Sequence, residues 1–125
     1  MNIGEIPINK FIGIKSRGEE GSVLYLEFKA NLQNHLGTFH AGAQFALAEA
    51  CSGYCLQKNF PLLENSVIPV LRKADVKFKK VASSNIQAKA EIKAENKEKF
   101  ERQFKKKGRA SLSVTVDIMT QDGTV

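Results

Sequence analysis

The sequence predicts an α+β domain in which an antiparallel sheet wraps around one long central helix. The helix is expected over residues 41–56, which contain no proline, no β-branched residue and a single charge. These features favour a helix over a strand. Almost every face of this helix carries apolar or very small residues, so other structure has to cover it. Segments of alternating apolar and polar residues on either side of the helix supply the strands of that cover.

Strands are expected wherever apolar side chains recur at every second position. Before the helix, such a strand covers residues 22–30, and residues 11–14 are expected to pair with it as a hairpin. The helix ends near Asn59-Phe60-Pro61. After it, strands are expected at residues 69–81, 86–93 and 109–120.

Two stretches near the C-terminus are harder to assign. Residues 97–107 form a charged run with only Phe100 and Phe104 as apolar anchors, which suits either a surface helix or a solvated extension of a hairpin. We favour the hairpin extension. Asp122-Gly123 predicts a turn, but only Thr124 and Val125 follow it, so the last strand is expected to be absent or very short.

Length and composition indicate a single domain over residues 1–125. The chain has 42% hydrophobic residues, enough for a core without disulfides. No apolar run approaches the roughly 20 residues that span a bilayer, and the N-terminus does not resemble a signal peptide. We therefore expect a soluble, cytoplasmic protein with no membrane partner.

Cys51 and Cys55 lie one turn apart on the predicted helix, where free cysteine behaves as a small apolar residue. Two histidines and this cysteine spacing match no zinc pattern. We expect the cysteines to pack in the core, with no metal and no separate cofactor.

The net charge is +6, from 19 Lys and Arg against 13 Asp and Glu, and the excess lies between Arg72 and Arg109. Such a surface suits a phosphorylated partner. Nucleic acid is not expected, because the basic segments lack interleaved aromatic residues and no recognition helix is evident. A small molecule with a nucleotide tail fits as well, and the alternative is a solvated basic surface without a partner.

Glu49 is the first candidate site residue. A carboxylate on an otherwise uncharged helix is costly out of water unless it is paired or hydrogen-bonded. The alternative is that Glu49 lies at a subunit boundary with its head group in solvent.

Asn34, then His40-Ala41-Gly42, then Glu49 nine residues after the histidine and Gly53 further on form a recognisable pattern. It resembles the site segment of hot-dog-fold acyl-CoA thioesterases, in particular the phenylacetate-pathway and acyl-CoA-thioesterase-13-like branch. The likeness covers roughly residues 10–123 and implies a hot-dog fold and hydrolysis of an acyl-CoA thioester to acid and thiol. The chain differs in having Ala41 in place of a glycine, and no hydroxyl residue near Leu71 on the strand after the helix.

Thioester hydrolysis needs donors for the oxyanion and a base or nucleophile for attack. The N–H groups of Ala41 and Gly42 would supply the donors, because the first N–H groups of a helix have no intrahelical partner. Glu49 would be the general base or the nucleophile. The eight residues from Ala41 to Glu49 span about 12 Å, so one carbonyl cannot touch both in one chain. The resemblance implies that antiparallel helices of two subunits complete the site, in a homodimer or a homotetramer.

The remaining site residues have secondary roles. Asn34 would position the thioester or water, or it is a turn residue. His40 would orient the loop, or it is a capping or packed histidine with no chemical part. The phosphates of coenzyme A, which enters as part of the substrate, would meet a basic set consisting of Arg72, Lys73, Lys77, Lys79 and Lys80.

Two other functions compete with hydrolysis. A non-catalytic acyl-CoA-binding protein is made plausible by Ala41 and Leu71. A hot-dog dehydratase or hydratase also uses a histidine and an acidic residue, but in different motifs around the helix, which this sequence lacks.

Overall fold

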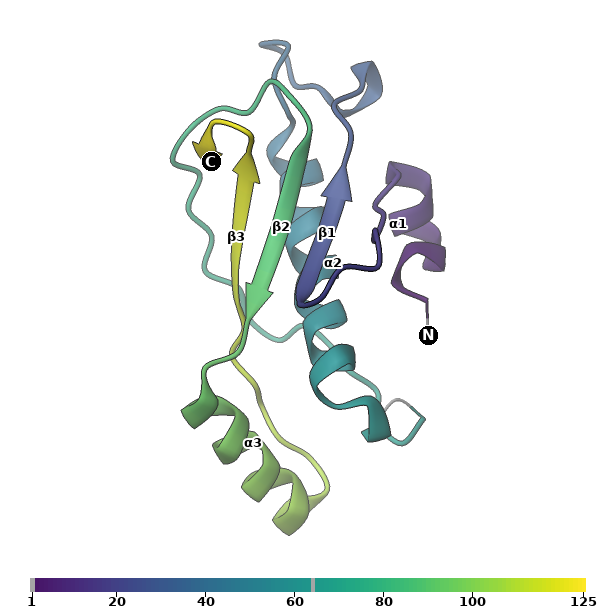
Figure 1. Cartoon of the computed structure of the whole chain (residues 1–125), viewed down its shortest axis with the longest axis vertical. Coiled ribbons are helices and arrows are strands. Elements are labelled where there is room, and N and C mark those ends of the chain that lie inside the picture. Colours follow the sequence, from purple (N-terminus) through teal and green to yellow (C-terminus); the bar gives the residue numbers. More distant parts are fainter. Residues whose placement is uncertain (1, 64) are drawn as a thin grey trace.

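The computed structural model describes residues 2–63 and 65–125, and it places one long helix across one face of an antiparallel sheet (Figure 1). The sheet has the order β1-β2-β3-β4, and its strands are β1 (Ser22–Leu26), β2 (Ile86–Glu91), β3 (Thr115–Thr120) and β4 (Gly123–Thr124). The α-helices are α1 (Pro7–Ile12), α2 (Ala41–Asn59) and α3 (Ala94–Lys107), and the 3-10 helices are η1 (Ile3–Glu5), η2 (Ala30–Leu32) and η3 (Pro61–Leu63). This arrangement confirms the predicted α+β class with a long central helix.

The core lies between α2 and the sheet. Leu24 of β1 pairs with Ala88 of β2, and Ala88 pairs with Ile118 of β3, so the strands present one apolar row. The face of α2 that meets the sheet consists of Ala43, Gln44, Leu47, Ala50, Cys51 and Cys55, all buried. Full burial of one large side chain contributes about 1.5–3 kcal/mol, so this contact dominates the stability of the fold.

The two cysteines pack in this core as predicted. Burial, and next the neighbouring Cys55, raise the pKa of Cys51 to about 12. Its thiol donates to the carbonyls of Ser22 at 3.2 Å and Ala88 at 3.4 Å. Cys51 therefore stays protonated and is not a nucleophile near neutral pH.

The N-terminal segment corrects one prediction. Residues 11–14 do not form a strand, because Pro7 begins the short helix α1 and Gly13, at φ 98°, ends it. The expected hairpin is reduced to a single bridge between Lys15 and Tyr25. A proline at the first turn and a left-handed glycine just past the end are standard boundaries of a helix.

Residues 97–107 correct a second prediction, because they lie in the helix α3 and not in a hairpin extension. Phe100 and Phe104, four residues apart, face the same side, and Phe100 packs on Phe60 with ring centroids 4.8 Å apart. Gly108, at φ 70°, caps the C-terminus. This aromatic contact gives an otherwise polar helix a surface on which to fold.

The predicted strand at residues 69–81 is not part of the sheet. The chain there runs as a drawn-out segment alongside β3 without a ladder partner among the described residues (Figure 1). Its apolar residues are exposed, including Val70 at 80% and Phe78 at 52%. β4 pairs only with Met119 and Thr120, so among the described residues no strand pairs with the outer edge of β3 before Met119. Likewise β3 begins at Thr115 and not at Arg109.

We predict that Phe100→Ala destabilises the protein by about 3 kcal/mol, because it removes a buried ring that holds α3 on the body. The measurement is the free energy of unfolding in urea, together with helix content by circular dichroism. Phe11→Ala is the matched control, since Phe11 is 80% exposed, and it should change stability by less than about 0.5 kcal/mol. Equal effects of the two substitutions would contradict the packing role of Phe100.

Candidate functional site

The loop of residues 34–39 delivers the chain to the start of α2 and is held on both sides. The N–H of Phe39 donates to the carbonyl of Ala82 at 2.8 Å, and the N–H of His40 donates to that of Leu32 at 2.8 Å. Gln33 and Phe39 form an isolated bridge across the base of the loop. The first turn of α2 therefore has a fixed position relative to β2.

Asn34 uses its whole side-chain amide to shape this loop. Its Oδ1 accepts from the N–H groups of Leu36 at 2.9 Å and Thr38 at 3.1 Å. Its Nδ2 donates to Thr38 Oγ1 at 2.8 Å and to the Phe39 carbonyl at 3.4 Å. Two acceptor positions and two donors are all that an asparagine amide has. The structure thus gives Asn34 the turn role, and direct contact with a substrate would require breaking these bonds.

His40 is the N-cap of α2. The N–H of Gly42 donates to His40 Nδ1 at 2.8 Å. A Cβ on residue 42 would lie 3.0 Å from Nδ1 and 3.2 Å from Cε1 of the ring. Glycine at position 42 thus lets the imidazole pack closely against the helix backbone.

The backbone N–H groups in the first turn of α2 differ in their acceptors. The N–H groups of Ala43 and Gln44 both donate to the His40 carbonyl, each at 3.1 Å. The Gly42 N–H has no partner within the helix, as expected, but it donates to the ring of His40 and is therefore not free. Within residues 2–63 and 65–125, the Ala41 N–H is the one first-turn donor without an acceptor, and Ala41 is exposed. The candidate oxyanion site therefore has one free backbone donor.

Glu49 is exposed in the single chain, on the side of α2 that faces away from the sheet. It lies seven residues, about two turns, after Gly42, so the two positions share a face. The sequence left open a buried and a solvent-exposed Glu49, and in one chain the side chain is exposed to solvent. Because Ala41 and Glu49 lie on the same continuous helix, they stay about 12 Å apart along its axis. One chain does not bring them together.

Gln44 is a polar residue that sequence reasoning missed. It is buried, at 6% exposed, and its Nε2 donates to the Phe39 carbonyl at 3.3 Å. Its position four residues after His40, on the inner face of the helix, is the signal that marks it. Gln44 ties the first turn of α2 to the loop before it.

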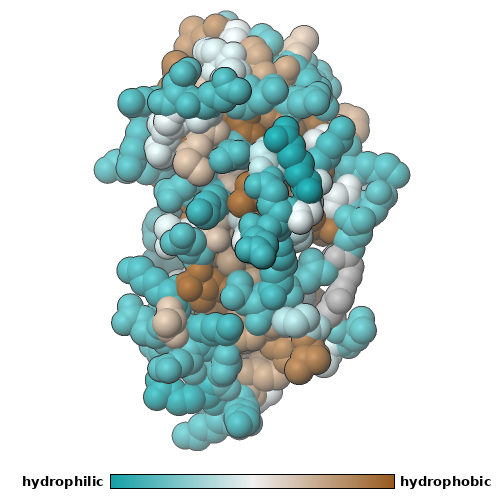
Figure 2. All heavy atoms as spheres, in the orientation of Figure 1, coloured by the Kyte–Doolittle hydropathy of each residue, from teal (hydrophilic) through white to brown (hydrophobic). Residues whose placement is uncertain are grey.

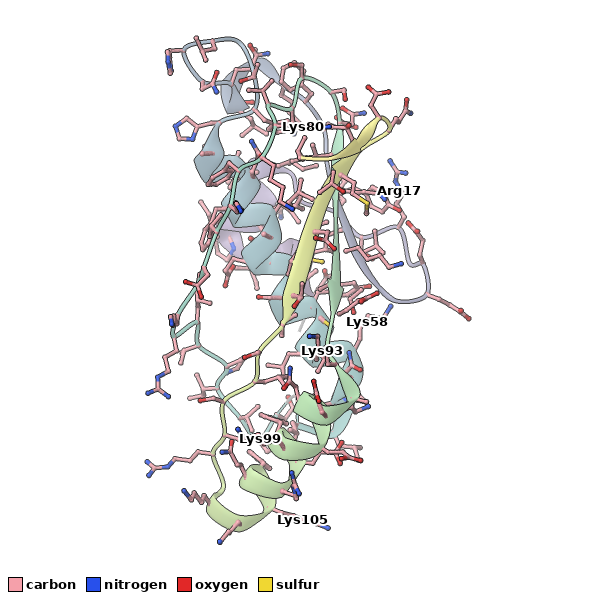
Figure 3. All side chains as sticks on the ribbon, turned by 90° about the vertical axis from the view of Figure 1, so that its left-hand side faces the viewer. Arg17, Lys58, Lys80, Lys93, Lys99 and Lys105 are labelled. Carbon is pink, nitrogen blue, oxygen red and sulfur yellow. The ribbon has the colours of Figure 1, made fainter. Side chains whose placement is uncertain are left out.

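The basic candidates all lie on the exposed segment at residues 69–81. Lys80 is close to the site, since Ala82 accepts from Phe39, and Figure 3 shows it at the end of the molecule opposite α3. Arg72 lies near the other end, where its Nη1 donates to Ser111 Oγ at 3.3 Å. Eight extended residues span about 26 Å, so Arg72 and Lys80 serve different neighbourhoods.

Among the hollows on the described part of the surface are two that no candidate catalytic residue lines. One, of about 340 Å³, lies between residues 80–84 and the turn before β4. The other, of about 680 Å³, lies between the N-terminal segment and the last turns of α2. Since neither hollow reaches the candidate catalytic residues and Ala41 is exposed, the start of α2 is an open surface in one chain.

The strand hydroxyl that the resemblance would place near Leu71 is missing. Leu71 is 54% exposed, and the nearby Ser66 uses its Oγ to donate to the Leu63 carbonyl at 3.3 Å.

Solved structures with the same fold identify the architecture. A Pseudomonas aeruginosa protein of unknown function, named a probable thioesterase, is 24% identical with a TM-score of 0.75, over 98% of this chain and 83% of that one. The PaaI protein of the Escherichia coli phenylacetic acid degradation operon is 17% identical with a TM-score of 0.72, over 97% and 78%. A mutant thioesterase enzyme from Staphylococcus aureus is 16% identical with a TM-score of 0.70, over 95% and 90%. The chain shares its fold with these structures, and this is the hot-dog fold that the sequence pattern predicted.

The family follows from the sequence itself. The model described as "Domain of unknown function (DUF4442)" matches residues 17–125. The chain therefore belongs to this family. No curated protein sequence matches it.

We predict that His40→Ala destabilises the protein by about 1 kcal/mol through loss of the helix cap, and that His40→Asn does not, because asparagine is a good N-cap residue. Unfolding in urea measures both. His35→Ala is the control, since His35 is exposed in the preceding loop and should change stability by less than about 0.5 kcal/mol. Alanine and asparagine giving the same stability at position 40 would argue against the capping role.

Proposed function

We propose that this protein hydrolyses an acyl-CoA or related thioester to the free acid and thiol, as a homodimer in the cytoplasm. One observation carries the proposal: α2 begins with an exposed, unpaired N–H at Ala41 and carries Glu49 on its outward face. The fold shared with structures named as thioesterases supports it. Coenzyme A enters as part of the substrate, and no separate cofactor is needed.

In the proposed reaction, the thioester carbonyl oxygen accepts from the Ala41 N–H at the positive end of α2. Glu49 takes a proton from water as the water oxygen attacks the carbonyl carbon. The tetrahedral intermediate then collapses, the carbon–sulfur bond breaks, and the thiolate leaves and is protonated. If Glu49 is the nucleophile, its carboxylate forms a mixed anhydride and releases the thiol first, and water then hydrolyses the anhydride.

Two chains are required for either route, because Ala41 and Glu49 of one helix lie about 12 Å apart. The face of α2 that carries Glu49 is not covered by the sheet. An antiparallel helix from a second copy would place its Glu49 opposite this Ala41 and would restore the symmetry-related site as well. A tetramer would pair two such dimers.

Coenzyme A phosphates would be met first by Lys79 and Lys80, because these residues lie nearest the loop before α2. Lys73 and Lys77 lie further along the same segment. Arg72 already donates a hydrogen bond to Ser111. We therefore rank Lys79 and Lys80 above the other three.

A non-catalytic acyl-CoA-binding protein is the second candidate. The observation that favours it is the engagement of the Gly42 N–H by His40, which leaves one backbone donor for an oxyanion. A panel of acyl-CoA thioesters with free thiol as the readout separates the two functions. Saturable binding without thiol release would support the binding protein.

We predict that Glu49→Gln lowers the rate of thiol release by about 10² to 10⁴ while substrate binding and dimer formation persist. Glutamine keeps the volume of the side chain but neither accepts a proton from water nor attacks a carbonyl. The control is Glu27→Gln, at an exposed position after β1, with wild-type turnover expected. Unchanged turnover in Glu49→Gln would remove Glu49 from the reaction.

A second substitution tests the oxyanion donor. Ala41→Pro deletes the free N–H, and proline is well tolerated at the first position of a helix after an extended residue, which His40 is at ψ 137°. We predict a loss of about 10² to 10³ in kcat, with stability retained in urea unfolding. Wild-type turnover in Ala41→Pro would exclude this N–H as the oxyanion donor.

The same two variants test the two-chain site. When the Ala41→Pro and Glu49→Gln variants are mixed, unfolded and refolded together, each heterodimer that forms has one site in which both Ala41 and Glu49 are intact. Random pairing should restore about a quarter of the wild-type activity, and sedimentation should show a dimer at micromolar concentration. The proposal of a site shared between two chains would be contradicted if the protein sedimented as a monomer. It would also be contradicted if the refolded mixture were as inactive as each variant alone.

A further inference from the structure

Helix α3 occupies a connection that the sheet does not require. β2 and β3 are antiparallel neighbours, paired from Gln87–Met119 to Glu91–Thr115, and such strands are usually joined by two to five residues. Here residues 92–114 join them, and 14 of these residues form α3. Figure 1 shows α3 beyond the end of the sheet, at the opposite end of the molecule from the loop that begins α2. This insertion adds a surface and leaves the sheet unchanged.

That surface holds most of the net charge of the protein. Residues 93–109 contain eight basic and three acidic residues, a net charge of +5, while the whole chain carries +6. The exposed basic residues, which we call the α3 basic surface, are Lys93, Lys99, Arg102, Lys105, Lys106, Lys107 and Arg109. Within the part of the chain that the structure describes, none of them forms an ion pair.

The inner side of α3 packs against the body of the protein through aromatic contacts. Phe100 and Phe104 stack at 6.0 Å between centroids, Phe100 packs on Phe60, and the Lys97 ammonium lies 5.5 Å from the centroid of the Phe60 ring. On the outer side, the side chains of the α3 basic surface form no hydrogen bond or ion pair with any other described residue. Figure 3 shows Lys99 and Lys105 on α3 at the end of the molecule, and Figure 2 shows hydrophilic residues over the same end. Lys99, Arg102 and Lys106 share one helical face by their spacing.

An exposed apolar side chain accompanies these charges. Leu62, in η3, is 94% exposed. It follows Phe60 by two residues, and Phe60 contacts Phe100 of α3. A cluster of lysines and arginines with an exposed aliphatic residue near it is typical of proteins that lie on anionic lipid. Protein interfaces, in contrast, are poor in lysine, and single-strand nucleic-acid sites expose aromatic rings.

We propose that the α3 basic surface, with Leu62 at its edge, binds an anionic lipid surface. The association is peripheral, since no helix within residues 2–63 and 65–125 is long and apolar enough to cross a membrane. This proposal differs from the expectation, made from the sequence, that the protein has no membrane partner. That expectation was based on the lack of a membrane-spanning segment. Within one chain the surface lies far from the start of α2, because Phe60 follows the last residue of α2 and is about 28 Å from Ala41 along the axis.

Co-sedimentation of the full-length protein with vesicles tests the proposal. We expect binding to phosphatidylglycerol–phosphatidylcholine vesicles at low salt, loss of binding at high salt, and none to phosphatidylcholine alone. Each lysine or arginine near an anionic surface contributes roughly a fivefold factor in partitioning. The triple variant Lys99→Glu, Arg102→Glu, Lys106→Glu should therefore bind at least about 100-fold more weakly. Leu62→Ser should weaken binding several-fold at unchanged charge.

The control carries the same change in net charge elsewhere: Lys10→Glu, Lys15→Glu, Lys89→Glu, at exposed positions outside α3. It should bind much more tightly than the α3 triple variant, and circular dichroism should show that both are folded. Equal binding of the two triple variants, or no binding of wild type to anionic vesicles, would overturn the proposal. Wild-type binding by Leu62→Ser would overturn it too. So would tighter binding to polyglutamate or duplex DNA than to vesicles, which would point to an acidic protein or nucleic acid.

Discussion

The contact between the inner face of α2 and the sheet determines where everything else in this protein lies. Leu47 and Cys51 are completely buried against strands whose Leu24 and Ala88 are also completely buried. Because this face is fixed, the opposite face of α2 is fixed as well, and Glu49 has to point away from the sheet. The proposed site needs a second subunit for this reason, because Ala41 and Glu49 are held apart on one rigid helix and cannot both contact the same substrate.

The sequence predicted those elements whose signals are local and periodic. The composition of residues 41–56 identified α2, and alternation identified β1 and β2 to within a few residues of their ends. The lysine-rich run was assigned incorrectly, because what makes it a helix is the packing of Phe100 on Phe60, a contact across 40 residues of chain. Residues 69–81 alternate well, but alternation describes side chains and not the neighbour that a strand needs for its backbone.

The candidate site divides in the same way. The start of the helix follows from local composition, so Ala41 was a predictable position, whereas the exposure of Glu49 was only one of two alternatives that the sequence left open. The sequence left two roles open for Asn34 and did not predict the acceptor of the Gly42 N–H, because both depend on hydrogen bonds between side chains and backbone in a folded loop. The space beside the backbone of Gly42 is taken by the ring of His40.

The capping bond of His40 also fixes what kind of group this histidine is. In a neutral imidazole one nitrogen carries the hydrogen and the other has the lone pair. Since Nδ1 accepts from the Gly42 N–H, the hydrogen resides on Nε2, and neither nitrogen has a lone pair left for a proton from water. As long as α2 stays capped, His40 is a hydrogen-bond donor without a free lone pair, so the proposed reaction needs a base other than this histidine.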